Sequence, residues 1–219
     1  DQSTDTCTNN FATLNPLNLT ESNASFSEGN LKFTNTLNSS PYHGLAHGTM
    51  AVANGKWYFE VRVDAIGGTA MSIGVENVEL FSKNNVAGQV GIGYFNNGNV
   101  YIRGSSTGSM PTYTTDDMIG VALDMDNTKV YFHKNGTYIN SGDPTSGATG
   151  TGAFSLNAAE TLVTPAVSNY QSGVCNVNFG SPYFAISSGN TDGNGYGNFE
   201  YAVPSGYYAL NTKNLSEFG

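Results

Sequence analysis

The sequence predicts an all-β protein in which two antiparallel sheets pack face to face as a β-sandwich. Three observations predict this fold class. Apolar residues recur at every second position in several short runs, each run ends in Gly, Asn, Asp or Ser, and no segment of a dozen residues has the 3.6-residue period of a helix. Short strands with one buried and one solvated face are typical of such sandwiches.

The strands are expected where the alternation is strictest. These runs lie at 56–64, 71–75, 90–94, 119–125 and 128–134. The residues that we expect to point into the core are Trp57, Phe59, Val61, Val63, Met71, Ile73, Val75, Val90, Ile92, Tyr94, Val121, Leu123, Val130, Phe132 and Phe179. The alternate residues of the first run, among them Glu60, Arg62 and Asp64, are expected to face water as a cross-strand ladder of charges. His133 is expected on the wet face of its strand.

Two turns are predicted from their residue types. Asp126-Asn127 separates the strand at 119–125 from the strand at 128–134. Asn135-Gly136 follows directly and suits a type I′ turn, in which both residues have positive φ. The sequence therefore predicts consecutive antiparallel strands over this region.

Composition and charge exclude several classes of protein. The chain has 219 residues, with 38% hydrophobic and 12% aromatic residues, while asparagine and glycine occur 27 times each. Lys and Arg number 8 against 17 Asp and Glu, a net charge of −9, and the cations do not cluster. Nucleic acid binding needs a basic face, so we expect no nucleic acid partner. No run approaches 18 apolar residues, so we expect no membrane insertion.

The chain is expected to form one domain. We assign residues 9–215 to it, with an N-terminal extension at 1–8, a C-terminal end at 216–219 and a loop insertion at 185–198. No internal repeat or break in composition marks a second domain. Because the sequence starts at Asp1 rather than at Met, we expect a processed or excised part of a longer product.

The two cysteines leave two readings open. Cys175, Val177 and Phe179 share one face of a strand, so Cys175 is expected to be a small core residue. A bridge between Cys7 and Cys175 is the alternative if the chain matures outside a cell.

Several segments together resemble a known family. These are GKWYFEV at 55–61, SIGVE at 72–76, GYFNNGNVY at 93–101, the block from Ile119 to Pro144, and LVTPAVSNY and VCNVNFGSPYF further on. They resemble the SPRY domain. The flanks NNFATLNPLN at 9–18 and FEYAVPSGYYALNTKNL at 199–215 resemble the flanks of SPRY modules in structural proteins of tailed bacteriophages.

The resemblance implies a concanavalin A-like sandwich whose variable rim loops form a binding surface, with neither a catalytic residue nor a cofactor. The sequence departs from the family at Cys7, where phage relatives tend to carry Pro, at His43, where many carry Arg, and in the insertion at 185–198. The His43 departure means that no known SPRY ligand is carried over to this chain.

The function that this predicts is a non-catalytic module of a virion. It would present its loops to a glycan of the host surface or to a neighbouring virion protein, as a homo-oligomer within the assembly. The alternatives are a purely structural subunit that decorates a capsid or filament and, more remotely, a glycan-cleaving sandwich enzyme. The residues that we expect to contact a ligand from the loop rim are Tyr42, His43, Asn77, Glu79, Phe81, Asn96, Asn97 and Tyr113.

Four patterns that could carry chemistry have simpler explanations. GSSTG at 104–108 matches a nucleophile-elbow pattern, but no helical period follows it. Glu60 and Asp64 could form a glycanase pair, but Arg62 between them would keep both ionised. The three histidines, His43, His47 and His133, lack further ligands for a metal. Asp192, Asn194 and Asn198 could bind calcium, but ordinary turn chemistry explains them equally.

Overall fold

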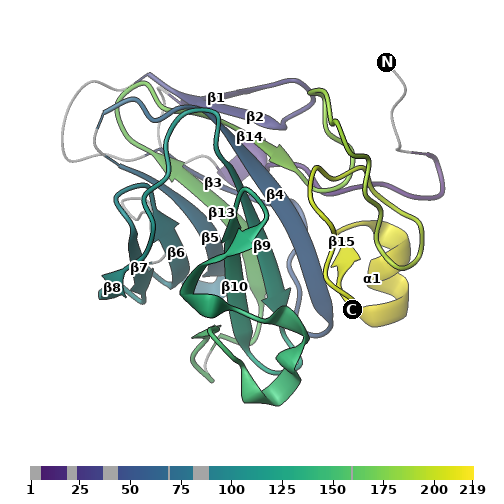
Figure 1. The fold of residues 1–219 in the computed structure, drawn as a ribbon. Coiled ribbons are helices and arrows are strands. Elements are labelled where there is room, and N and C mark those ends of the chain that lie inside the picture. The colour runs from purple at the N-terminus through teal and green to yellow at the C-terminus, as the bar shows by residue number, and fades with distance from the viewer. Residues whose placement is uncertain (1–5, 19–23, 37–43, 69, 81–88, 159) are drawn as a thin grey trace.

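The computed structural model describes residues 6–18, 24–36, 44–68, 70–80, 89–158 and 160–219. These residues form two antiparallel sheets that pack face to face, so the predicted β-sandwich is confirmed (Figure 1). One short α-helix, α1 (Thr212–Phe218), lies near the C-terminus. No helix in this described part of the chain is long and apolar enough to cross a membrane.

The larger sheet has the strand order β1-β2-β14-β4-β9-β10-β11, and β12 pairs with β10 while β15 pairs with β4. Its strands are β1 (Ala24–Ser27), β2 (Lys32–Asn35), β4 (Lys56–Ala65), β9 (Met118–Asp124), β10 (Lys129–Lys134), β11 (Thr137–Tyr138), β12 (Phe154–Ser155), β14 (Val174–Asn178) and β15 (Tyr208–Ala209).

The smaller sheet has the order β3-β13-β5-β6-β7-β8. Its strands are β3 (Gly44–His47), β5 (Met71–Asn77), β6 (Gly91–Phe95), β7 (Asn99–Ile102), β8 (Ser105–Ser109) and β13 (Val163–Asn169). The described chain also has four 3₁₀ turns, namely η1 (Pro16–Asn18) before β1, and η2 (Val78–Leu80), η3 (Ile139–Ser141) and η4 (Pro144–Thr149) between later strands.

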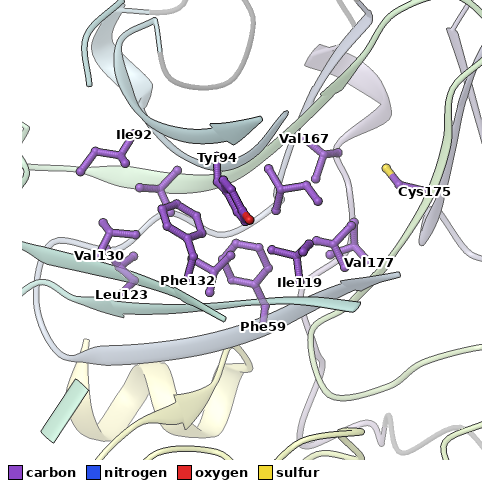
Figure 2. Close-up of a cluster of buried hydrophobic side chains, with 14 of the residues drawn as sticks. Phe59, Ile92, Tyr94, Ile119, Leu123, Val130, Phe132, Val167, Cys175 and Val177 are labelled. Carbon is purple, nitrogen blue, oxygen red and sulfur yellow. The ribbon is translucent and has the colours of Figure 1, made fainter. Parts of the chain in front are cut away.

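The core lies between the sheets, and the alternation predicted most of it. Trp57, Phe59 and Phe132 of the larger sheet are buried, as is Tyr94 of the smaller sheet. Figure 2 shows Phe132 and Tyr94 pointing toward each other from opposite sheets, with ring centroids 5.6 Å apart. Period-2 alternation therefore identified the inward face of both sheets.

The two predicted turns differ in outcome. Asn135 and Gly136 have φ of 49° and 81°, as the predicted hairpin turn between β10 and β11 requires. The turn between β9 and β10 is longer than expected, because Asp124 pairs with Lys129 and leaves residues 125–128 as the loop. Thr128 takes the positive φ there, at 56°.

The outer face of the larger sheet is buried where the sequence predicted that it faces water. Tyr58, Glu60 and His133 were expected to face water, yet each is 1% exposed or less. The chain beyond residue 182 crosses this face (Figure 1), where Phe199 and Tyr207 pack with Tyr58 in a second apolar cluster. The sheet is therefore buried on both faces here, which an alternating strand pattern cannot reveal.

The two flanks of the domain are joined to each other. Ala12 N donates to Leu210 O at 2.9 Å, and Thr212 N donates to Asn10 O at 3.0 Å. Asn211 caps α1 by accepting from Asn214 N. The helix runs to Phe218, across the boundary that we predicted at residue 215.

The bridge between the cysteines is not formed. Cys7 is exposed and Cys175 is buried, and both are free. Cys175 lies in the main core, where burial raises the pKa of its thiol. The core reading of Cys175 is thus confirmed, and the Cys7–Cys175 alternative is wrong for this structure.

Candidate recognition rim

The register of the smaller sheet divides the predicted contact residues between two ends of the sandwich. In β5, Met71 pairs with Asn169 at one end and Asn77 pairs with Val163 at the other. Six residue steps along a strand separate them by about 20 Å. Asn96, Asn97 and Tyr113 lie at the Met71 end, while Asn77 and Glu79 lie at the opposite end. Tyr42, His43 and Phe81 fall outside the described residues.

Tyr113 is a buried anchor rather than an exposed contact residue. Its side chain is 3% exposed, and its hydroxyl donates to Met71 O at 2.8 Å and to Tyr94 O at 3.0 Å. Its ring also meets the ring of Tyr94 edge to face, 5.0 Å between centroids. A loop position suggested exposure, but the loop folds back over the end of the core and buries the ring. Tyr113 therefore holds the loop in place.

Of the two predicted contact residues at the opposite end, Asn77 is buried and Glu79 is exposed. Asn77 is buried, and its Oδ1 accepts from Glu79 N at 2.8 Å, which closes a local turn after β5. The expectation that Asn77 faces a ligand is therefore corrected. Glu79 is exposed, but it stands apart from the Asn96 end of the sheet.

Asn96 joins three segments at the Met71 end. Its N donates to Met71 O at 3.0 Å, its Oδ1 accepts from Met71 N at 2.9 Å, and its O accepts from Tyr113 N at 3.0 Å. The turn between β6 and β7 is thus tied to the start of β5 and to the loop before β9. We call the surface formed by residues 66–68, 95–98, 110–117, 134–136 and 170–173 the Asn96 rim.

Further hydrogen bonds connect the rest of the Asn96 rim. Gly68 N donates to Tyr170 O at 3.2 Å, which links the loop after β4 to the turn after β13. Asn135 Nδ2 donates to Asp117 Oδ1 at 2.6 Å, and Lys134 Nζ lies 3.0 Å from Asp117 Oδ2. Through these bonds, the Asn96 rim extends from the turns of the smaller sheet to the turns of the larger sheet.

Asp117 is the carboxylate that Lys134 and Asn135 contact where the Asn96 rim meets the larger sheet. Burial acts to raise the pKa of its carboxyl, but hydrogen bonds from Thr114 N, Lys134 and Asn135 outweigh burial and hold the pKa below its usual value. Lys134 also donates to Thr112 O at 2.8 Å. The sequence pattern by itself did not indicate this pair. The hairpin register could have found it, because Lys134 lies opposite Ile119, two residues after Asp117.

The exposed surface of the Asn96 rim is mostly neutral and polar. Its exposed residues are Gly67, Asn97, Pro111, Thr112, Thr114, Thr115, Asp116, Asn135, Gly136 and Ser172. Such a surface offers many hydrogen-bond donors and acceptors and little net charge. Because turns from both sheets are bonded together, it is held in one shape before any partner arrives.

The glycanase reading of Glu60 and Asp64 does not fit this structure. Glu60 is buried and accepts from Tyr58 Oη at 2.9 Å, Glu200 N at 2.9 Å and Tyr201 N at 2.8 Å. Burial raises the pKa of Glu60 despite these bonds. Asp64 is bonded to Arg62 Nε at 2.8 Å on the open part of the face. No open carboxyl pair is available to a sugar at this position.

Asp192, the candidate calcium ligand, has both carboxylate oxygens engaged. Oδ1 accepts from Asn194 N and Tyr196 N, and Oδ2 accepts from Ala209 N and Asn214 Nδ2, all at 2.8–2.9 Å. The turn-chemistry reading therefore accounts for this residue. Across the described residues, no group of three His, Cys, Asp or Glu side chains could hold a metal ion.

The GSSTG segment forms an edge strand. Residues 105–109 are β8, exposed throughout and paired only with β7. No helix follows it, so Ser106 is not held on a strand-to-helix turn as a nucleophile elbow requires.

Comparison with known proteins identifies the fold. A family model described as the SPRY domain matches residues 56–182, which is more than half of the chain. The chain belongs to the SPRY domain family. The matched region runs from β4 through β14, so β1 to β3, β15 and α1 lie outside it. No curated protein sequence matches the chain.

Solved structures of SPRY domains agree with this assignment at the level of the fold. The SPRY domain of human HERC1 is 17% identical, covers 78% of this chain and 99% of its own, and superposes with a TM-score of 0.58. A second human SPRY domain is 16% identical, covers 71% and 94%, and has a TM-score of 0.52. SPRY domains are typically non-catalytic modules that mediate protein–protein interaction. The two relatives are human proteins, so the virion origin stays a prediction.

Proposed function

We propose that this SPRY domain is a non-catalytic recognition module that binds a protein partner through the Asn96 rim. The observation that carries the proposal is the set of hydrogen bonds that joins turns of both sheets into one polar surface, with Asn96 and Asp117 as its two centres. A surface that is already ordered loses little conformational entropy when it binds, so modest polar contacts suffice for specific recognition.

The partner that we propose is a neighbouring protein of a bacteriophage particle, with a glycan of the host surface as the alternative ligand. The resemblance of the flanks at 9–18 and 199–215 to those of phage structural proteins supports this placement. The neutral character of the rim supports either ligand, because amide and hydroxyl groups can bond both to a peptide backbone and to sugar hydroxyls. Because SPRY domains typically mediate protein–protein interaction, membership of this family favours a protein partner over a glycan.

A pair of matched variants tests the proposal. Thr114→Arg with Thr115→Arg places two bulky cations on the exposed rim, while Ser25→Arg with Ser27→Arg adds the same charge to exposed positions of β1 on the larger sheet. We expect only the rim variant to lose binding to purified virion proteins, as measured by surface plasmon resonance. Equal binding by both variants would show that the rim is not the interface. Binding of the wild-type chain to host polysaccharide alone would favour the glycan.

A further inference from the structure

The chain contains four Asn-Gly pairs, which begin at Asn54, Asn97, Asn135 and Asn194. Such a pair can rearrange without an enzyme. The backbone nitrogen of the glycine attacks Cγ of the asparagine side chain and forms a C–N bond. The glycine nitrogen gives up its proton, the Cγ–Nδ2 bond breaks, and the side-chain nitrogen takes up a proton and leaves as ammonia. Water then opens the cyclic imide and leaves an aspartate or an isoaspartate. Glycine permits the attack because it has no Cβ to obstruct it.

Two of the four asparagines are held through their side-chain amide nitrogens. Asn135 donates through Nδ2 to Asp117 Oδ1 at 2.6 Å and accepts through Oδ1 from Met118 N at 2.8 Å. Asn194 donates through Nδ2 to Asn214 Oδ1 at 3.0 Å and to Glu217 Oε2 at 3.2 Å. In both, the leaving amide nitrogen is bonded, so the side chain cannot turn toward the glycine until the region opens.

Asn54 is held through its peptide group instead. Its O accepts from Trp57 Nε1 at 2.7 Å, and the following Gly55 N donates to Asp126 Oδ1 at 2.8 Å. Both polar atoms of the peptide unit that must rotate are thus fixed, and the attacking nitrogen is bonded to a carboxylate. This pair should open less readily than one held by a single bond.

Asn97 has a different environment. It is exposed, and its Oδ1 accepts from Asn99 N at 3.0 Å. That N–H points at the oxygen on which negative charge develops when Cγ is attacked, so it stabilises the tetrahedral intermediate in the way that an oxyanion hole does. Gly98 N donates only to Phe95 O, a neutral carbonyl, at 2.9 Å.

We propose that Asn97 is a site of spontaneous deamidation and that the other three Asn-Gly pairs are protected by the fold. The product places a negative charge on an exposed turn of the Asn96 rim. If the rim binds a partner as proposed above, this charge changes the affinity with the age of the protein. The chemical step itself does not depend on that function.

Peptide mapping by mass spectrometry tests the proposal on the full chain, incubated in mildly alkaline buffer at body temperature. We expect the peptide that contains Asn97 to convert at least about tenfold faster than those that contain Asn135 and Asn194, with Asn54 between them. In denaturant the deamidation rates of the four Asn-Gly pairs should become similar, because only the local sequence then controls them. Conversion of Asn135 or Asn54 as fast as Asn97 in the folded chain overturns the proposal.

The effect on binding is tested separately. Asn97→Asp mimics one product, and Asn97→Ser keeps the turn neutral while it removes the reactive amide. We expect Asn97→Asp, but not Asn97→Ser, to change affinity for the virion protein that binds the rim. Deamidation without any change in affinity would confirm the chemistry and contradict the role of the rim.

Discussion

Asn96 and Met71 bind each other twice, once through the backbone of both residues and once through the Asn96 side chain. Asn96 N donates to Met71 O at 3.0 Å, and Asn96 Oδ1 accepts from Met71 N at 2.9 Å. The pair fastens the turn between β6 and β7 to the first residue of β5. It therefore joins two of the segments that form the Asn96 rim.

Asn96→Ala should weaken this connection. It leaves Met71 N without its acceptor, and we expect the free energy of unfolding to fall by about 1–2 kcal/mol. Urea denaturation followed by Trp57 fluorescence measures the change. Asn96→Asp is the matched control, because its carboxylate still accepts from Met71 N. A loss in the Asp variant as large as in the Ala variant would contradict the assignment of this bond.

Tyr113→Phe should separate the anchoring role of the hydroxyl from that of the ring. The phenylalanine keeps the edge-to-face contact with Tyr94 but removes the hydroxyl that donates to Met71 O and Tyr94 O. We expect a loss of about 1–2 kcal/mol in unfolding free energy and faster amide exchange over residues 111–116. Unchanged exchange in that loop would mean that the ring alone holds it.

Glu60→Gln should release the segment that crosses the larger sheet. Glu60 accepts from the backbone N–H groups of Glu200 and Tyr201, and a glutamine presents an NH₂ group to one of these donors. We expect hydrogen exchange at residues 199–201 to speed up and the unfolding free energy to drop by about 2 kcal/mol. The exposed Glu79→Gln serves as the control. If exchange is unaffected in Glu60→Gln, the segment is held by its aromatic side chains instead.

His133 should make the stability of the protein depend on pH. Its Nδ1 accepts from Gly136 N at 3.1 Å, so the ring proton is on Nε2, which faces Tyr58 Oη at 2.7 Å. Burial lowers the pKa of His133 from 6.5 to about 4. The neutral ring therefore contributes stability that is fully present above pH 6.5 and is lost as the pH falls from 6.5 toward 4. The full shift corresponds to roughly 3 kcal/mol.

Two groups near His133 modify this profile. Glu60 has a raised pKa, so its contribution is lost as the pH rises through its folded pKa and opposes that of His133. The phenols of Tyr58, Tyr138 and Tyr201 surround the ring but stay protonated over this range, because burial raises the pKa of each. NMR titration of the His133 ring measures the pKa of this residue separately from the pKa values of its neighbours. A midpoint near 6.5 would show that the ring is not held neutral.

The alternation of residue types was sufficient to predict the inward face of the sandwich. Side chains alternate strictly along a strand, so Trp57, Phe59 and Phe132 had to share a side with their apolar neighbours. The turn at Asn135-Gly136 was equally predictable, because few residues other than Asn and Gly accept positive φ at both positions. These are local properties, and the local sequence contains them.

The candidate site was predictable only in part, because its members are brought together by register. Asn96 and Asn97 lie beyond the Met71 end of β5, but Asn77 belongs to the other end of that strand. The pairing of β5 with β6 and β13 decides which end each turn occupies, and no single segment contains that information.

The sequence alone determined the central strands β4, β5, β6, β9 and β10, the apolar side of each, and the sharp turn at Asn135-Gly136. Tertiary structure decided what covers the outer face. Glu60 reads as a solvated charge in its own strand, yet its acceptors are filled by Tyr201 N, 141 positions away in the chain. Burial is set by what packs on a residue, and contacts between such distant segments arise only when the whole chain has folded.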